Sequence, residues 1–171
     1  ARAQRWDPAE AIRALLAEEL AGRQASSIRA RRKAAGFPTG KTFDVWDETL
    51  SSIPAPTQRA LRTLEWVDRH ENLVVCGPSG TGKTHFLEAL GQACVDAGHK
   101  VSWFSLEHLG ALVRRHGADD TAGRAIKRIM RADVIVIDDI GLLPVTTETA
   151  EALYRVVDAA YEKRSIALSS N

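Results

Sequence analysis

The sequence predicts an α/β protein built on a doubly wound parallel sheet, and three observations support this fold class. Short apolar segments alternate with helical segments from residue 73 to the end of the chain. One of them, residues 134–137, is apolar at every position, as expected of a strand buried on both faces of a parallel sheet. A glycine-rich loop, residues 77–84, joins the first apolar segment to the helix after it. In such sheets ligands bind at the carboxyl ends of the strands, and we expect a site there.

Residues 1–36 are expected to form a helical arm of one or two helices outside this sheet. Asp7 followed by Pro8 is a helix start, because the carboxylate caps the first turn and proline fits the first helical position. Gly22 either ends the first helix or only weakens it, and Gly36 ends the arm. An apolar stripe at helical spacing runs along the first part of the arm. The stripe consists of Ile12, Leu15, Leu16 and Leu20.

A linker is expected at residues 37–56, because prolines and glycines recur there, and the core is expected at 57–171. Trp46 in the linker either packs on the core or lies near a nucleotide base. Thr57 is expected to cap the first helix of the core. The expected strands are residues 73–76, 101–104, 134–137 and 166–168, and the expected helices are residues 57–70, 83–97, 106–116, 122–130 and 147–162.

The glycine-rich loop reads Gly-Pro-Ser-Gly-Thr-Gly-Lys-Thr and matches the phosphate-binding pattern G-x-x-x-x-G-K-[ST] at every required position. Its backbone N–H groups and the following helix N-terminus favour phosphate oxygens. We expect Lys83 to contact the β- and γ-phosphates of ATP and Thr84 to ligate Mg²⁺. A glycine-rich turn that matches by chance is the alternative, and the order of strand, loop and helix argues against it. The expected nucleotide contacts are Gly77, Pro78, Ser79, Gly80, Thr81, Gly82, Lys83, Thr84 and His85, the last of which more often packs or caps than catalyses.

Polar residues follow the two last predicted strands. Asp138 and Asp139 come after residues 134–137, where a Walker B element would place a Mg²⁺-binding carboxylate and a residue that orients or deprotonates the attacking water. Acids that cap the next segment are the alternative. Asn171 ends the last strand, where an amide can align the water, and a plain turn residue is the alternative.

Net charge is only +1, but basic residues are unevenly distributed. Residues 22–41 carry six basic residues and no acidic one, which favours contact with a phosphate backbone. A second basic group lies on one face of the helix expected at 122–130, where a merely solvated face is the alternative. The candidate DNA contacts are Arg29, Arg31, Arg32, Lys33, Arg124, Lys127, Arg128 and Arg131.

The two cysteines, Cys76 and Cys94, lack metal-binding spacing and are expected to be buried residues of a protein in the reducing cytoplasm. No apolar run approaches the ~20 residues that span a bilayer, so a membrane protein is not expected.

The sequence resembles the IstB-like transposition helper ATPases, relatives of the DnaC-type helicase loaders in the AAA+ class. The resemblance rests on Gly-Pro-Ser-Gly-Thr-Gly-Lys-Thr-His at 77–85, on Ile-Asp-Asp-Ile-Gly at 137–141 and on Ser170-Asn171. The basic arm and the segment Thr-Phe-Asp-Val-Trp-Asp at 42–47 agree with it. It covers essentially all 171 residues. The loop alone is generic to P-loop NTPases, so the arm, the linker aromatics and the His85 continuation carry the specificity.

The resemblance implies a strand order of 5-1-4-3-2, the last strand being absent here, and hydrolysis of ATP by a homo-oligomer on double-stranded DNA. It also implies that the protein delivers or activates a transposase at target DNA. Lys83 and Thr84 correspond to the phosphate and Mg²⁺ contacts, Asp138 to the Walker B metal residue and Asn171 to the first sensor. Asp139 stands where the family usually has Glu, and the sequence stops before the family's arginine finger, so weak hydrolysis is expected.

Three alternatives remain at the level of sequence. A DnaC-type replicative helicase loader would use the same ATP chemistry with another partner. A small-molecule P-loop kinase would need an acceptor-binding lid and no basic arm. A nucleotide-dependent scaffold that does not hydrolyse ATP would fit the departure at Asp139.

Overall fold

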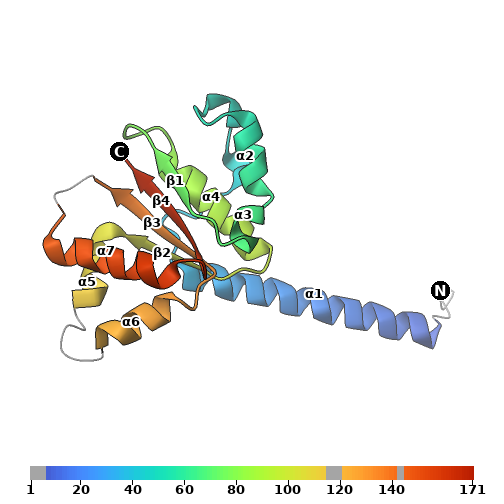
Figure 1. The fold of residues 1–171 in the computed structure, drawn as a ribbon. Coiled ribbons are helices and arrows are strands. Elements are labelled where there is room, and N and C mark those ends of the chain that lie inside the picture. The colour runs from blue at the N-terminus through green and yellow to red at the C-terminus, as the bar shows by residue number, and fades with distance from the viewer. Residues whose placement is uncertain (1–6, 115–120, 142–144) are drawn as a thin grey trace.

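The computed structural model describes residues 7–114, 121–141 and 145–171, and it shows a parallel sheet between two layers of helices (Figure 1). The strands are β1 (Leu73–Cys76), β2 (Val101–Ser105), β3 (Val134–Ile140) and β4 (Ser165–Ser170). All pairs are parallel and the order is β1-β4-β3-β2. This is the expected order without its fifth strand, and the predicted fold class is confirmed.

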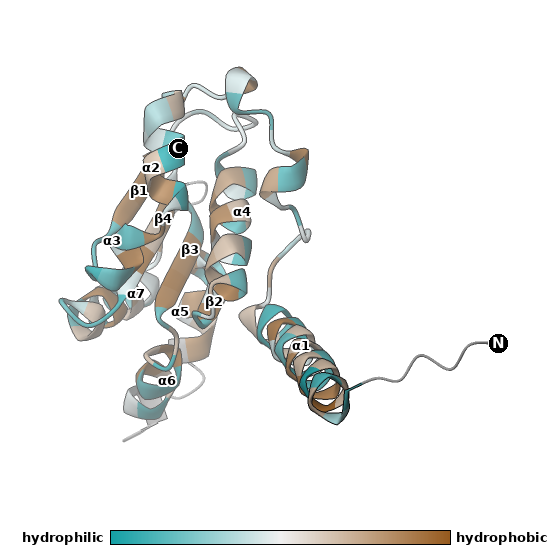
Figure 2. Ribbon diagram, turned by 90° about the vertical axis from the view of Figure 1, so that its right-hand side faces the viewer, coloured by the Kyte–Doolittle hydropathy of each residue, from teal (hydrophilic) through white to brown (hydrophobic). Residues whose placement is uncertain are grey.

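Side chains of β3 point alternately into two hydrophobic layers because successive residues of a strand face opposite sides. Val134 and Val136 pack with α4 (Lys83–Asp96). Ile135 and Ile137 pack instead with α5 (Leu106–Arg114), α6 (Thr121–Ile129) and α7 (Thr147–Ala160). Figure 2 shows the strands as the hydrophobic centre between the helices. The carboxyl ends of the strands therefore meet at one edge, held from both sides.

The N-terminal arm is a single helix, α1 (Pro8–Ala35), that continues through Gly22 without a break. Asp7 caps its start by accepting a hydrogen bond from the Ala9 N–H, and Gly36 ends it with a left-handed φ of 76°. Only its C-terminal part packs on the body, through Ala35 and residues near it. The four side chains of the apolar stripe are more than half exposed, and α1 projects from the body (Figures 1 and 2).

The segment between the arm and the sheet is more structured than a linker. It contains two short 3-10 helices, η1 (Phe43–Val45) and η2 (Glu48–Leu50), followed by α2 (Ala55–Arg62) and α3 (Glu65–Asp68). The predicted single helix at 57–70 is wrong at both ends. It begins two residues earlier and breaks at Leu64, whose left-handed φ of 63° buries its side chain in the core beside Trp66 and Val67.

Other differences arise at the sheet. β3 and β4 are longer than predicted, so both acids lie within β3 and not after it. The prediction that both cysteines are buried is wrong for Cys76, which is exposed because β1 is at the edge of the described sheet. Cys94 is fully buried, and burial raises the pKa of its thiol to about 12. Among the described residues, no helix is long and apolar enough to span a bilayer.

Candidate nucleotide-binding site

The phosphate-binding loop connects β1 to α4, in the order that the motif requires. The Gly77 N–H donates to the Ser170 carbonyl at 3.1 Å, so the loop starts as an extension of the sheet. Gly82 then takes a left-handed φ of 87° immediately before α4 begins at Lys83. The Thr81 hydroxyl donates to the Pro78 carbonyl at 2.8 Å, which is a hydrogen bond within the loop. The result is a compact loop at the N-terminus of a helix, the arrangement that binds phosphate.

Lys83 is buried and connects the loop to the end of β4. Its ammonium group donates to the carbonyls of Gly77 at 2.5 Å and Pro78 at 2.9 Å, and to Asn171 Oδ1 at 2.8 Å. Parallel strands bring their carboxyl ends to the same edge, so two residues far apart in the sequence become neighbours. The structure thus places Lys83 and Asn171 in one site.

Thr84 and Asp138 form the second connection at this edge. The Thr84 hydroxyl donates to Asp138 Oδ1 at 3.2 Å, and Asp138 is only 4% exposed. The buried Ser169 hydroxyl donates to the same Oδ1 atom. Hydroxyl and carboxylate oxygens beside a phosphate loop are the ligand set that Mg²⁺ prefers. The residues present therefore fit a Mg²⁺ ion bound together with a nucleotide.

Asp139 adopts a left-handed conformation, with φ 61°, next to Asp138. Its N–H donates to Ser169 Oγ at 2.9 Å, and its side chain is exposed. Desolvation and the charge of Asp138 raise the pKa of Asp139, while Lys83 opposes the shift. A raised pKa makes this carboxylate a better proton acceptor than an ordinary aspartate.

Aromatic side chains cover the start of α4. The Trp46 ring lies so close to Gly82 that a Cβ built there would be 3.2 Å from Trp46 Cζ3. His85 packs edge-on against the same ring, with 4.9 Å between centroids, and its Nε2 lies 3.4 Å from the Thr42 carbonyl. Trp46 thus packs on the core, as one of the two interpretations of it expected. His85 takes part in this packing through its contact with Trp46, and its expected contact with the nucleotide stays a prediction.

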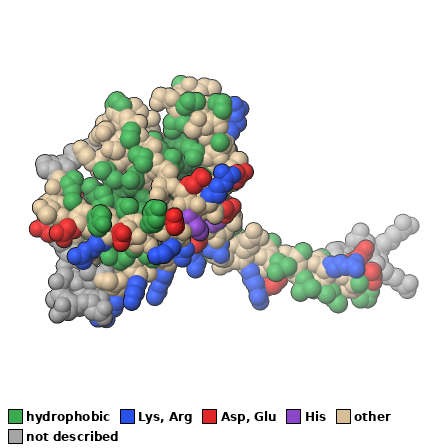
Figure 3. All heavy atoms as spheres, viewed as in Figure 1, with side chains coloured by type: hydrophobic (Ala, Val, Ile, Leu, Met, Phe, Trp, Pro, Cys, Tyr) green, Lys and Arg blue, Asp and Glu red, His purple; other side chains and the backbone are tan. Residues whose placement is uncertain are grey.

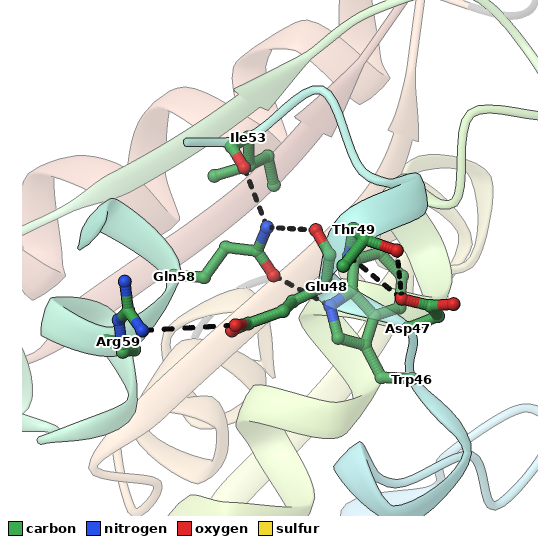
Figure 4. A network of polar contacts seen from close by, with 7 residues as sticks. All are labelled: Trp46, Asp47, Glu48, Thr49, Ile53, Gln58 and Arg59. Atoms are coloured by element: carbon green, nitrogen blue, oxygen red, sulfur yellow. Dashed lines mark hydrogen bonds and ion pairs between the residues drawn. The ribbon is translucent and has the colours of Figure 1, made fainter. Parts of the chain in front are cut away.

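Gln58 holds Trp46 in this place (Figure 4). The Gln58 side chain is 1% exposed, and its Oε1 accepts a hydrogen bond from Trp46 Nε1 at 2.8 Å. Its Nε2 donates to the carbonyls of Glu48 at 3.1 Å and Ile53 at 2.7 Å. One amide on α2 therefore satisfies three groups of the segment before that helix, and orders residues 46–53 beside the phosphate loop.

The candidate DNA contacts fall into two groups. Arg29 and Lys33 are exposed on α1, but Arg31 and Arg32 are half-buried. Arg32 forms an ion pair with Asp96 at the end of α4, in which its Nη2 donates to Oδ1 at 2.7 Å and to Oδ2 at 2.8 Å. The second group is exposed on or just after α6, opposite the buried residues of that helix, and Figure 3 shows basic side chains along this edge of the body. This group consists of Arg124, Lys127, Arg128 and Arg131.

Sequence reasoning missed three residues at or near the site: Ser169, Gln58 and Glu88. A signal existed for Ser169, because a period of two places it on the same face of β4 as Asn171. The polar side chains of Gln58 and Glu88 on helices look like solvated ones in the sequence, and only tertiary packing buries them.

The family model described as IstB-like ATP binding protein matches residues 1–171 of this chain. The chain belongs to the IstB-like ATP-binding protein family. An insertion sequence IS21 ATP-binding protein of Pseudomonas aeruginosa is 37% identical over 157 residues, which are 91% of this chain and 59% of that relative. The chain therefore spans about three fifths of the length of curated relatives that it matches.

Solved structures share the fold of this IstB-like chain. The AMPPCP-bound DnaA from Aquifex aeolicus matches with a TM-score of 0.62 and 20% identity, covering 80% of this chain and 44% of that one. The DnaC helicase loader matches with a TM-score of 0.60 and 21% identity, covering 78% of each chain. At such identities the likeness defines the fold alone.

Proposed function

We propose that this chain is a cytoplasmic ATPase that assists DNA transposition. In this proposal it binds Mg·ATP, assembles as a homo-oligomer on double-stranded target DNA, and recruits or activates a transposase. One observation carries the nucleotide part, namely that two hydrogen bonds join the phosphate loop and α4 to the ends of the central strands. Lys83 donates to Asn171, and Thr84 donates to Asp138. The groups to which we assign phosphate binding, metal binding and water orientation therefore lie at one edge of the sheet, which supports the proposal.

Each residue has a distinct role in the proposed hydrolysis. Lys83 and the loop N–H groups bind the phosphates, and Thr84 and Asp138 would hold Mg²⁺, which neutralises phosphate charge when bound. Asp139 orients the attacking water or accepts a proton from it. Its raised pKa favours proton acceptance. Asn171, whose Oδ1 accepts a hydrogen bond from Lys83, aligns that water.

The DNA part of the proposal rests on charge and on family membership. Arg29 and Lys33 are exposed on the part of α1 without acidic residues, and a second exposed basic group lies at α6. Exposed cations of this kind bind phosphate backbones. The relatives are named as proteins of insertion sequences, which favours transposition over the helicase-loader alternative that shares this fold.

The test is fluorescence anisotropy of a generic DNA duplex with and without Mg·ATP over a salt series. We expect ATP to tighten DNA binding, Lys83→Ala to abolish that effect, and affinity to fall steeply with salt. Lys33→Ala should reduce the salt slope by about one unit. Arg13→Ala removes an exposed charge from the acid-containing part of the same helix and should not. A chain that binds ATP but ignores DNA at low salt would contradict the DNA part of the proposal for this chain.

A further inference from the structure

Ser169 is a fully buried residue at the centre of the nucleotide-binding site, and the roles proposed above do not use it. It lies on β4, two residues before Asn171. Its hydroxyl donates to Asp138 Oδ1 and accepts a hydrogen bond from the Asp139 N–H at 2.9 Å. One hydroxyl therefore contacts both acids of the site, through the carboxylate of one and the backbone of the other.

The pairing of β3 with β4 explains why a hydroxyl is needed there. Ile137 pairs with Leu168 and Ile140 pairs with Ser170, with a register shift between the two pairs. Two residues of β3, Asp138 and Asp139, therefore oppose the single residue Ser169. This is a β-bulge, which leaves a ladder N–H without its regular partner. The Ser169 hydroxyl accepts a hydrogen bond from the Asp139 N–H and so satisfies a backbone group that would otherwise stay unpaired.

The same hydroxyl constrains both acids. By donating to Asp138 it holds one carboxylate oxygen on the side of Thr84, whose hydroxyl donates to the same atom at 3.2 Å. By accepting the Asp139 N–H it supports the left-handed backbone that a non-glycine residue adopts only when its surroundings impose it. Without the hydroxyl, the Asp138 carboxylate could rotate and the bulge could return to regular pairing.

We propose that Ser169 is a positioning residue that orients Asp138 toward the metal and maintains the bulge that presents Asp139. This inference rests on the proposed function, because the metal concerned is the Mg²⁺ bound with ATP. Residues that orient a metal ligand typically contribute 10- to 100-fold to metal affinity or activity.

Ser165 offers a matched control on the same strand. It is also fully buried, and its hydroxyl donates to the carbonyls of Trp66 and Val67 at 3.3 and 3.5 Å. An even spacing of four places both serines on the same face of β4. Ser165 lies at the start of the strand and Ser169 near its end, so only the second contacts the two acids.

The experiment compares the affinity for ATP in Mg²⁺ with the affinity in EDTA, for the wild type and for Ser169→Ala, Ser169→Thr and Ser165→Ala. The wild type should bind more tightly in Mg²⁺. Ser169→Ala should reduce this Mg²⁺ increment by about 10-fold or more and lower kcat, while binding in EDTA changes little. Ser169→Thr keeps the hydroxyl and should retain the increment. Ser165→Ala should lose thermal stability without losing the increment.

Hydrogen exchange at the Asp139 amide gives a second readout, since loss of its acceptor should accelerate exchange at that site. If Ser169→Ala does not fold, Ser169→Cys keeps a side chain with a weaker donor, and the same comparison applies. An unchanged Mg²⁺ increment in Ser169→Ala, or in Ser169→Cys if the alanine variant does not fold, overturns the inference while the proposed function stands. A wild type that binds nucleotide equally in Mg²⁺ and EDTA, or not at all, overturns both.

Discussion

Replacing Glu88 with alanine is expected to lower the free energy of unfolding by about 3 kcal/mol. Glu88 on α4 is fully buried, and its carboxylate binds Thr39 and Gly40 in the segment that follows α1. Oε1 accepts the N–H groups of Thr39 at 3.1 Å and Gly40 at 2.5 Å, and Oε2 accepts the Thr39 hydroxyl at 2.6 Å. Because water reaches the exposed turn at Thr39 and Gly40, we assign about 1 kcal/mol to each lost bond, below the ~1.5–3 kcal/mol of a fully buried charged one.

Thermal unfolding followed by circular dichroism measures this loss. In a protein of this size 1 kcal/mol corresponds to about 2–4 °C in Tm, so Glu88→Ala should unfold about 6–12 °C below the wild type. The control is Gln92→Ala, one turn further along the same helix. Gln92 is also buried, but within the described part of the chain its Oε1 has no hydrogen-bond partner. Its truncation removes an unsatisfied group, so we expect it to cost about 1 kcal/mol or less.

Equal losses in Glu88→Ala and Gln92→Ala would refute the reasoning, because the cost would then come from truncating any buried polar side chain of α4. Glu88→Gln keeps the shape and removes the charge, and it should lie between the wild type and Glu88→Ala. Thr39→Ala removes only the side-chain bond and should lose about a third of the full effect.

Three further predictions concern the site and its support. The raised pKa of Asp139 means that the folded state binds more protons between the unfolded and folded pKa values, so stability falls as pH rises through that window. Asp139→Asn should therefore raise Tm at about pH 7, and thermal scans should show the gain vanish near about pH 3. Gly110→Ala would place a Cβ in steric overlap with Thr149 Oγ1 and should cost about 1–3 kcal/mol in denaturant melts. Gly123→Ala should not destabilise, because its Cβ would have no atom of the described residues within 4 Å apart from its chain neighbours and its own helix backbone. Gly82→Ala should weaken ATP binding at least about 10-fold in a direct titration, because its φ of 87° strains any side chain and the loop must shift; unchanged affinity would contradict this.

Much of the fold was predictable because its signals are local. The phosphate loop and the buried run that became β3 are encoded within short windows, through spacing, period and turn residues, whereas the order of the strands in the sheet was expected only from the resemblance to a family. The helix start at Asp7 and its end at Gly36 were equally readable. The break at Leu64 was not, because a left-handed leucine is favourable only when the core buries its side chain.

By itself the sequence predicted which residues bear the proposed chemistry: Lys83, Thr84, Asp138, Asp139 and Asn171 all come from motif positions. Tertiary structure alone decided how they meet. The bond from Lys83 to Asn171 depends on parallel pairing across the sheet, and the role of Ser169 depends on a single-residue bulge between two strands. Periodicity within one segment carries no information about register between segments. For the same reason the ion pair that occupies Arg32, and the burial of Gln58 and Glu88, became visible only in the folded chain.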